Sequence, residues 1–228
     1  PQPASTIELG AMMKRWNSTY PQFDEEMAGY NLKVIGFRPL ENYGMICTKP
    51  VRSVEDFAGV RVRSFGFALP ALINALGGTP VSMSTPEAYE ALQRDILDCS
   101  PVGPTLASGW KYDEVAKYFI DLPLGALWGH LITMNREAYD ALDEQTQAIL
   151  VGLGSEYLVE YSAQVAIQTE EIKRKWKDMN VEVIPFPLSD IVTAAASDDV
   201  QAVRAEWIKK ASATGLPAAE IAAELQLK

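Results

Sequence analysis

The alternation of short apolar strands with helices between Val60 and Cys99 most constrains what this chain can fold into. Strand-like and helical segments follow one another in the order 60–63, 68–76, 80–83, 84–94 and 96–99. Consecutive strands that are joined through helices pair in parallel, because a parallel connection needs a crossover of a dozen residues or more. The segment therefore predicts a parallel sheet covered by helices, which is an α/β fold.

A long helix is the second constraint. Apolar residues keep to one face from residue 143 to 178, which predicts a strut connecting two parts of the molecule. An N-terminal helical stretch over 7–29 should break or kink at Pro21. The remaining pattern predicts strands at 32–37, 43–48, 130–135 and 181–184, a loop at 101–109, and helices at 110–118 and from 192 onward with a break at 215–217.

Composition excludes several classes of function. The 228 residues are 48% hydrophobic, which is enough for a sizeable core, and the net charge is -10. An acidic chain does not bind nucleic acid or an anionic membrane surface, because both need basic side chains. No apolar run reaches the roughly 20 residues of a membrane helix, so we expect no direct membrane insertion. The start at Pro1 has no basic segment, so we expect any signal peptide to have been removed.

The chain lacks the motifs of common enzymes. Its single histidine, His130, lies in an apolar strand, which favours a structural or ligand-contacting role over general-base catalysis. The patterns GxSxG, GxGxxG, GxxxxGK[ST] and HExxH are all missing. The two cysteines are far apart, which excludes a four-cysteine zinc site. We therefore predict no enzyme, no cofactor and no metal; an enzyme using Glu or Lys in a cleft is the less favoured alternative.

Five segments in a fixed order resemble a known family. The chain is similar to the solute-binding proteins of TRAP (tripartite ATP-independent periplasmic) transporters over roughly residues 32–184. The resemblance rests on 48–57 (TKPVRSVEDF), 59–63 (GVRVR), 75–83 (ALGGTPVSM), 87–93 (EAYEALQ) and 96–98 (ILD), and residues 133–145 with the long helix extend it. The family has about half a lobe before the position of Leu32, so we expect the N-terminal part of the first lobe to be missing here.

The resemblance implies a two-lobed periplasmic-binding-protein (type II-like) α/β fold with crossing hinge strands and a ligand cleft between the lobes. Residues 1–42 would then be the remainder of the first lobe and 43–130 the second lobe. Residues 131–184 would return to the first lobe with the connecting helix, and 185–228 would pack across both lobes. The implied function is periplasmic capture of a small organic acid and delivery to a TRAP membrane permease. A sensory receptor as the recipient is an alternative.

Arg63 is the main candidate for binding the ligand. In the family, an Arg at the end of this strand pairs with the ligand carboxylate, and the matching position is Arg63 rather than Arg61. The side-chain alternation of a strand places both arginines on the face opposite Val60 and Val62. Arg63 lies at the carboxyl end, where open α/β sheets bind ligands. A guanidinium offers a carboxylate two parallel N–H groups. The alternative is a surface salt bridge to a nearby acidic residue.

Further ligand contacts follow from the same resemblance. Phe65 stands where relatives have Pro, and Tyr43 stands where some relatives have a second basic residue, which predicts a monocarboxylate ligand. Ser100 and Val102 follow a strand at its carboxyl end, where relatives place polar side chains. Few polar anchors and several aromatic residues favour an aromatic or branched acid. The other candidates are Asn42 and the two tryptophans that would form cleft walls, Trp110 and Trp128.

Cys47 and Cys99 lie on predicted strands that the resemblance implies are neighbours in the sheet. A disulfide between them is geometrically possible, and the periplasm would permit it. Two buried thiols are an equal alternative at the level of the sequence.

Overall fold

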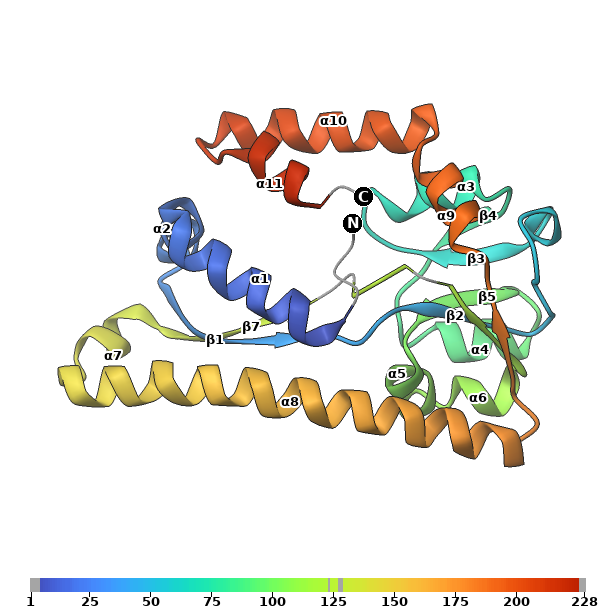
Figure 1. Ribbon diagram of the computed structural model, residues 1–228, viewed down its shortest axis with the longest axis horizontal. Coiled ribbons are helices and arrows are strands. Elements are labelled where there is room, and N and C mark those ends of the chain that lie inside the picture. The colour runs from blue at the N-terminus through green and yellow to red at the C-terminus, as the bar shows by residue number, and fades with distance from the viewer. Residues whose placement is uncertain (1–4, 123, 127–128, 226–228) are drawn as a thin grey trace.

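The computed structural model describes residues 5–122, 124–126 and 129–225. Figure 1 shows two sheets side by side, with the 35-residue helix α8 (Glu144–Asp178) running beneath both. The smaller sheet pairs β1 (Leu32–Pro39) with β7 (Gly129–Asn135) in antiparallel fashion. The larger sheet has the strand order β4-β3-β5-β2-β6-β8. The fold is therefore the mixed α/β architecture that the alternation predicted, and the long connecting helix is confirmed.

The larger sheet contains the predicted parallel segment. β3 pairs in parallel with both β4 and β5, whereas β2 pairs in antiparallel fashion with β5 and β6, and β8 is parallel to β6. The parallel prediction is thus confirmed for the strands from Arg61 to Val102, within a mixed sheet. The strand bounds are β2 Gly44–Cys47, β3 Arg61–Ser64, β4 Thr79–Ser82, β5 Cys99–Val102, β6 Tyr118–Asp121 and β8 Glu182–Pro185.

Helices cover both faces of the larger sheet (Figure 1). α3 (Leu69–Ala75) and α9 (Leu188–Ala195) share a buried apolar core with one face. On the other face the core is formed with α4 (Ala88–Gln93), α5 (Pro104–Gly109), α6 (Tyr112–Val115) and Trp176 of α8. The short 3-10 turn η1 (Glu55–Phe57) precedes β3. The central strands β2 and β5 are therefore buried on both sides, as in an α/β domain, whereas the edge strand β4 is partly exposed.

The smaller sheet lies against the N-terminal helices α1 (Thr6–Thr19) and α2 (Pro21–Gly29), and α7 (Arg136–Asp140) follows β7. Gly154 of α8 makes an unusually close contact, since a Cβ at that position would lie 1.8 Å from the carbonyl oxygen of Ile35 in β1. The break at Pro21 is confirmed, because α2 begins at this residue.

The C-terminal segment extends from the larger sheet back to α1. α10 (Asp198–Ala213) packs against α3, and α11 (Ala218–Glu224) packs against α10. Trp16 of α1 donates its indole N–H to Glu224 at 2.9 Å, and Arg15 forms an ion pair with the same carboxylate. In the part of the chain that the structure describes, none of the helices has the length and apolar character needed to cross a membrane.

Several expected elements differ from the structure in their bounds, among them the helix expected from 192 onward, which begins at Leu188 and is interrupted between α9 and α10. The strand expected at 96–99 begins only at Cys99, because the backbone N–H groups of Ile96 and Leu97 donate to the Ala91 carbonyl oxygen of α4 and not to a neighbouring strand. The loop expected at 101–109 contains α5, and the helix expected at 110–118 is the four-residue α6 followed by β6. Short elements such as these depend on their pairing partners more than on local propensity.

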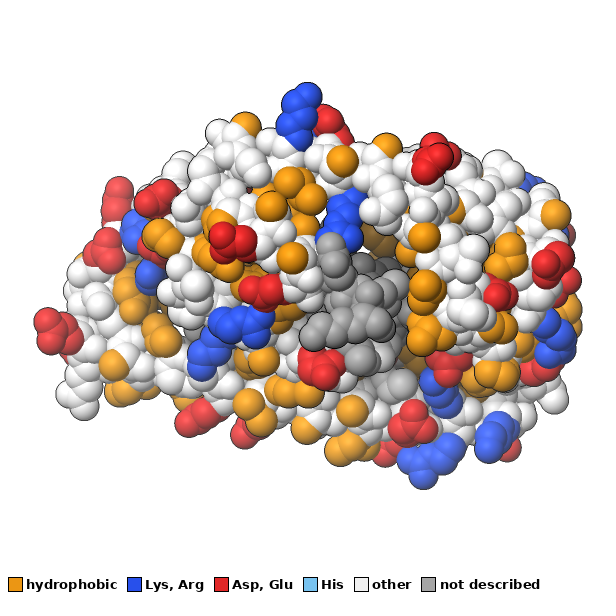
Figure 2. Space-filling view, turned by 45° about the horizontal axis from the view of Figure 1, so that its top comes forward, with side chains coloured by type: hydrophobic (Ala, Val, Ile, Leu, Met, Phe, Trp, Pro, Cys, Tyr) orange, Lys and Arg blue, Asp and Glu red, His pale blue; other side chains and the backbone are white. Residues whose placement is uncertain are grey.

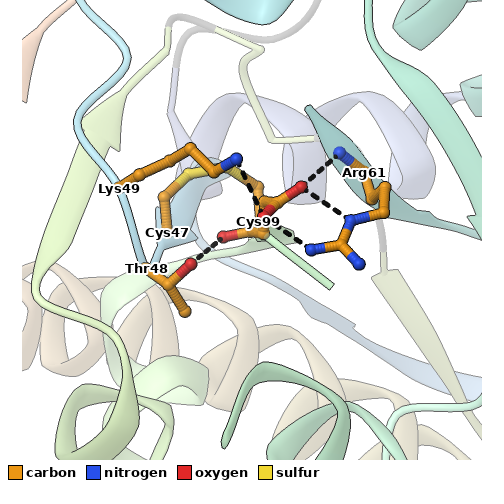
Figure 3. Close-up of a disulfide and its surroundings, with 6 residues drawn as sticks. Cys47, Thr48, Lys49, Arg61 and Cys99 are labelled. Atoms are coloured by element: carbon orange, nitrogen blue, oxygen red, sulfur yellow. Dashed lines mark hydrogen bonds and ion pairs between the residues drawn. A yellow bond between two sulfur atoms is a disulfide. The ribbon is translucent and has the colours of Figure 1, made fainter. Parts of the chain in front are cut away.

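Cys47 and Cys99 lie directly opposite each other on β2 and β5 and form a disulfide. Both residues are fully buried. Figure 3 shows the bond beside Thr48, Lys49 and Arg61. The two cysteines are 52 residues apart, so closing this loop removes chain entropy from the unfolded state equivalent to about 4 kcal/mol.

Candidate ligand-binding site

Arg63 is a buried residue on β3, with 7% of its surface exposed. Its neighbour Val62 faces the core shared with α3 and α9, and the alternation of the strand turns Arg63 to the opposite face. The guanidinium donates from Nε to the carbonyl oxygen of Met83 at 3.1 Å and from Nη2 to Oγ1 of Thr85 at 2.8 Å. These contacts fix the side chain against the turn that follows β4.

No acidic side chain in the described part of the chain forms an ion pair with Arg63. Burial lowers the pKa of the Arg63 guanidinium, and the nearby Tyr112 and Tyr43 act in the opposite direction. A buried cation without a counter-charge is costly, so it marks a place where a ligand can supply the charge.

Arg61 differs from Arg63 in this respect. Arg61 binds Asp98 through Nε at 3.0 Å and Nη2 at 2.9 Å, and Lys49 contacts the same carboxylate at 3.0 Å (Figure 3). Burial opposes ionisation of Asp98, but its hydrogen bonds with Arg61 and Lys49 outweigh burial and hold its pKa well below the usual range. The salt-bridge alternative therefore describes Arg61, whereas Arg63 has no acidic partner among the residues that the structure describes.

The hydrogen bonds of Arg63 also define which edge of the guanidinium is available. Nε–H and the N–H of Nη2 beside it form one edge of the planar group, and this edge faces Met83 and Thr85. The outer edge, formed by Nη1 and Nη2, offers the second pair of parallel N–H groups. That edge has the geometry for a bidentate contact with a carboxylate.

Aromatic side chains surround the guanidinium. The Arg63 Cζ atom lies 4.8 Å from the centroid of the Phe65 ring, which is a cation–π contact. Tyr43 is 8% exposed, and burial raises its pKa to about 12; the Glu41 carboxylate adds to this effect and Arg63 opposes it. Tyr112 is fully buried and donates its hydroxyl to the carbonyl oxygen of Thr85 at 2.6 Å.

Ser100 lies on β5, next to β3. Val62 is opposite Cys99 in the parallel pairing, so one residue further along both strands Arg63 lies beside Ser100, on the same face. Ser100 is fully buried, and its hydroxyl has no hydrogen-bond partner among the described residues. Ser100 and Val102 were expected after the strand, but both are within β5. Val102 is 3% exposed and packs in the core beneath the sheet.

Three further candidates were Asn42, Trp110 and Trp128. Asn42 is exposed and lies between Glu41 and Tyr43 in the segment that leads to β2. Trp110 follows α5 and is 43% exposed. Trp128 lies outside the described residues. Figure 2 shows a hollow near the centre of one face, beside residues that are not described, with hydrophobic side chains along its border.

Sequence reasoning missed three residues around Arg63. Thr85 was interpreted only as part of a helix start, and Tyr112 only as part of a helix; Met83 contributes its carbonyl oxygen, which no side-chain pattern indicates. The only signal at Tyr112 was the residue type itself, because a buried tyrosine normally finds a hydrogen-bond partner, and the charged residues on both sides of Tyr112 gave no indication that it would be buried.

Glu41 was also missed. It is 3% exposed and lies where the chain passes from β1 to β2. Its Oε1 accepts hydrogen bonds from Thr105 Oγ1 at 2.7 Å and Leu106 N at 3.1 Å, and its Oε2 from Thr105 N at 3.0 Å and Thr169 Oγ1 at 2.9 Å. One carboxylate thus joins the crossing segment to α5 and to α8.

Within the described ranges, no group of three or more His, Cys, Asp or Glu side chains could hold a metal ion. His130, on β7, is exposed, and its Nδ1 lies 3.3 Å from Nη1 of Arg38 on β1. A fixed guanidinium such as that of Arg63, with phenol and hydroxyl groups beside it, has the chemistry to bind an anion.

The family model for bacterial extracellular solute-binding proteins, family 7 (DctP), matches residues 11–210. The C4-dicarboxylate-binding periplasmic protein DctP of Rhodobacter capsulatus is 31% identical over 99 residues, which are 43% of this chain and 29% of that protein. The chain spans less than two thirds of the length of the curated relatives it matches.

Two solved structures from Desulfovibrio salexigens have the same fold. One TRAP periplasmic solute-binding protein superimposes with a TM-score of 0.80 at 22% identity, covering 97% of this chain and 67% of that one. A second, with bound orotic acid, has a TM-score of 0.78 at 20% identity and covers 94% of this chain and 69% of that one. The two-lobed fold predicted from the resemblance is confirmed.

Proposed function

The chain belongs to family 7 of the bacterial extracellular solute-binding proteins, and from this premise we propose that it captures a small organic acid between two lobes and delivers it to a TRAP-type membrane permease. Proteins of this family are periplasmic and bind solutes rather than transform them. The acid is held by Arg63, and residues 1–42 and 131–184 belong mainly to one lobe and residues 43–130 to the other.

The observation that carries this proposal is the buried guanidinium of Arg63 without an acidic partner in the described chain. Its outer edge can donate two parallel hydrogen bonds to a ligand carboxylate, since Met83 and Thr85 use the inner edge. A charge-assisted contact of this kind contributes about 1.5–3 kcal/mol. It also provides the counter-charge that the folded protein lacks.

The ligand is a monocarboxylate with an aromatic or branched apolar body. Tyr43 stands where some relatives have a second basic residue, and a phenol with a raised pKa stays neutral and offers a hydrogen bond without a charge. Phe65 and Tyr112 add apolar surface around the guanidinium. The relative that holds orotic acid, an aromatic monocarboxylate, is consistent with this class of ligand.

Capture proceeds by closure around the acid. The chain passes between the sheets from β1 to β2 and again from β6 to β7, and such connections are where a hinge absorbs a change in backbone angles. A ligand that contacts both lobes binds the closed state more tightly than the open one, so it shifts the population toward closure. The closed form is then the one that the permease receives.

Titration calorimetry with orotate, benzoate and succinate tests the proposal, together with mass spectrometry of any acid that co-purifies. Arg63→Gln should weaken binding of the preferred monocarboxylate on the order of 10- to 150-fold, which corresponds to the loss of one charge-assisted contact. The matched control is Arg94→Gln, which removes the same charge from an exposed i,i+4 pair. Unchanged affinity in Arg63→Gln contradicts the carboxylate clamp, and tighter binding of succinate than of the monocarboxylates contradicts the ligand class.

A further inference from the structure

The turn from Met83 to Thr85 is held by hydrogen bonds to Arg63, Tyr112 and Glu87. Arg63 donates to the Met83 carbonyl and to Thr85 Oγ1. Tyr112 donates its hydroxyl to the Thr85 carbonyl at 2.6 Å. The backbone N–H of Ser84 donates to the Glu87 carboxylate at 2.9 Å, in the manner of a capping box. The turn therefore has little freedom to move relative to β3 or to α6.

We propose that Thr85, held by Tyr112, is a positioning residue that orients Arg63 for carboxylate binding. This inference rests on the proposed function. The Thr85 hydroxyl is the acceptor that fixes Nη2, and Nη2 belongs to both edges of the guanidinium. Its position therefore sets the plane in which the outer edge presents its N–H groups to the ligand.

The physical reason is that a bidentate contact depends on the orientation of the guanidinium plane. Without the hydroxyl of Thr85, Arg63 keeps its Nε bond to Met83 but can rotate about the bonds of its side chain. The charge then remains in place, while the pair of parallel N–H groups is no longer fixed. A ligand group that accepts only one hydrogen bond, such as a neutral amide oxygen, is affected less by a rotating guanidinium than a carboxylate that needs both hydrogen bonds.

Tyr112 acts one step further away. It is fully buried, and its hydroxyl bonds to the backbone of Thr85 rather than to Arg63. Removal of this hydroxyl frees the turn without removing the acceptor for Nη2. We therefore expect Tyr112→Phe to have the same kind of effect as Thr85→Val but a smaller one.

The test compares an acid with its uncharged amide. Orotate and orotamide are titrated into the full 228-residue chain and into Thr85→Val, Thr85→Ser and Tyr112→Phe. We expect Thr85→Val to weaken orotate binding on the order of tenfold and to leave orotamide binding nearly unchanged, and we expect Thr85→Ser to restore orotate binding. A role limited to general folding would weaken both probes equally. The matched control is Thr193→Val, which removes an exposed hydroxyl from α9.

A ligand-free measurement keeps the two proposals separate. In side-chain 15N spectra, the Arg63 signal is assigned by its loss in Arg63→Gln, and exchange reports rotation of its guanidinium. We expect faster rotation in Thr85→Val and wild-type behaviour in Thr85→Ser. An unchanged spectrum overturns the positioning role, and so does an unchanged preference for orotate over orotamide. If no acid binds the wild-type chain, the proposed function fails, and the spectrum alone decides whether Thr85 holds Arg63.

Discussion

Replacing Glu41 by Gln tests how strongly one buried carboxylate joins the segment between the two sheets to its surroundings. Each oxygen of Glu41 accepts one backbone N–H and one threonine hydroxyl. A glutamine has one oxygen and one NH2 group, and the NH2 group cannot accept. In either orientation of the amide, therefore, the N–H of Thr105 or that of Leu106 faces another donor. The threonine hydroxyls can rotate to adapt, but the backbone cannot.

The magnitude follows from these contacts. One buried N–H without an acceptor costs about 1–3 kcal/mol. The remaining hydrogen bonds are no longer made to a charged acceptor, which lowers the contribution of each to stability by up to about 1 kcal/mol. We therefore expect Glu41→Gln to reduce the free energy of unfolding by about 3 kcal/mol. For a chain of this length, such a loss lowers the melting temperature by about 6–12 °C.

Thermal and urea unfolding followed by circular dichroism measure this change. Glu160→Gln is the matched control, because it removes the same charge from an exposed position on α8. We expect the control to change the free energy of unfolding by less than about 0.5 kcal/mol. A Glu41→Gln protein as stable as the control would refute the reasoning, since it would mean that the four hydrogen bonds at Glu41 contribute nothing that a neutral amide cannot replace.

Two further predictions concern α8 and the phenol beside Arg63. Gly154→Ala should destabilise the fold by about 1–3 kcal/mol, because its Cβ would overlap the Ile35 carbonyl. Gly152→Ala, with open space around it, should instead stabilise α8 by about 0.5–1 kcal/mol. The urea midpoints of both variants measure this difference, and equal effects would contradict the close contact at Gly154. The raised pKa of Tyr43 means that the folded state holds its proton more tightly than the unfolded state, so the stabilisation is complete below pH 10 and is lost as the pH rises toward 12. Relative to Tyr43→Phe, the free energy of unfolding of the wild type should fall by about 1.4 kcal/mol between pH 8 and pH 11. Parallel curves of unfolding free energy against pH for the two proteins would rule this out.

The comparison of Arg61 with Arg63 shows what alternation along a strand can and cannot predict. Alternation places both side chains on one face of β3, and the resemblance selects Arg63. Only the fold brings Asp98, 35 residues beyond Arg63 in the chain, against Arg61, while none of the described acidic side chains pairs with Arg63. The same fold supplies the acceptors at Met83 and Thr85, which are backbone and hydroxyl groups with no periodic signal.

The bounds of the short strands and the pairing of the cysteines also could not be predicted from local sequence. Ile96 belongs to a strand-like run in the sequence, yet it is 50% exposed and precedes β5, because its backbone N–H donates to the Ala91 carbonyl oxygen of α4. Cys47 and Cys99 were compatible with either a disulfide or two thiols until their strands were paired in register. Pairing between strands is non-local, so a local window contains little information about it.

Local patterns determined the elements whose energetics are local or periodic. The break at Pro21, the 35-residue helix and the alternation of strands with crossover helices from Val60 onward follow from backbone restrictions and apolar spacing, which the chain encodes within a few residues. The tertiary structure alone decided the register of β5, the anchoring of Glu41 and the pairing state of the two arginines. Those features depend on contacts between segments that are distant in the chain, and such contacts exist only once the elements have packed.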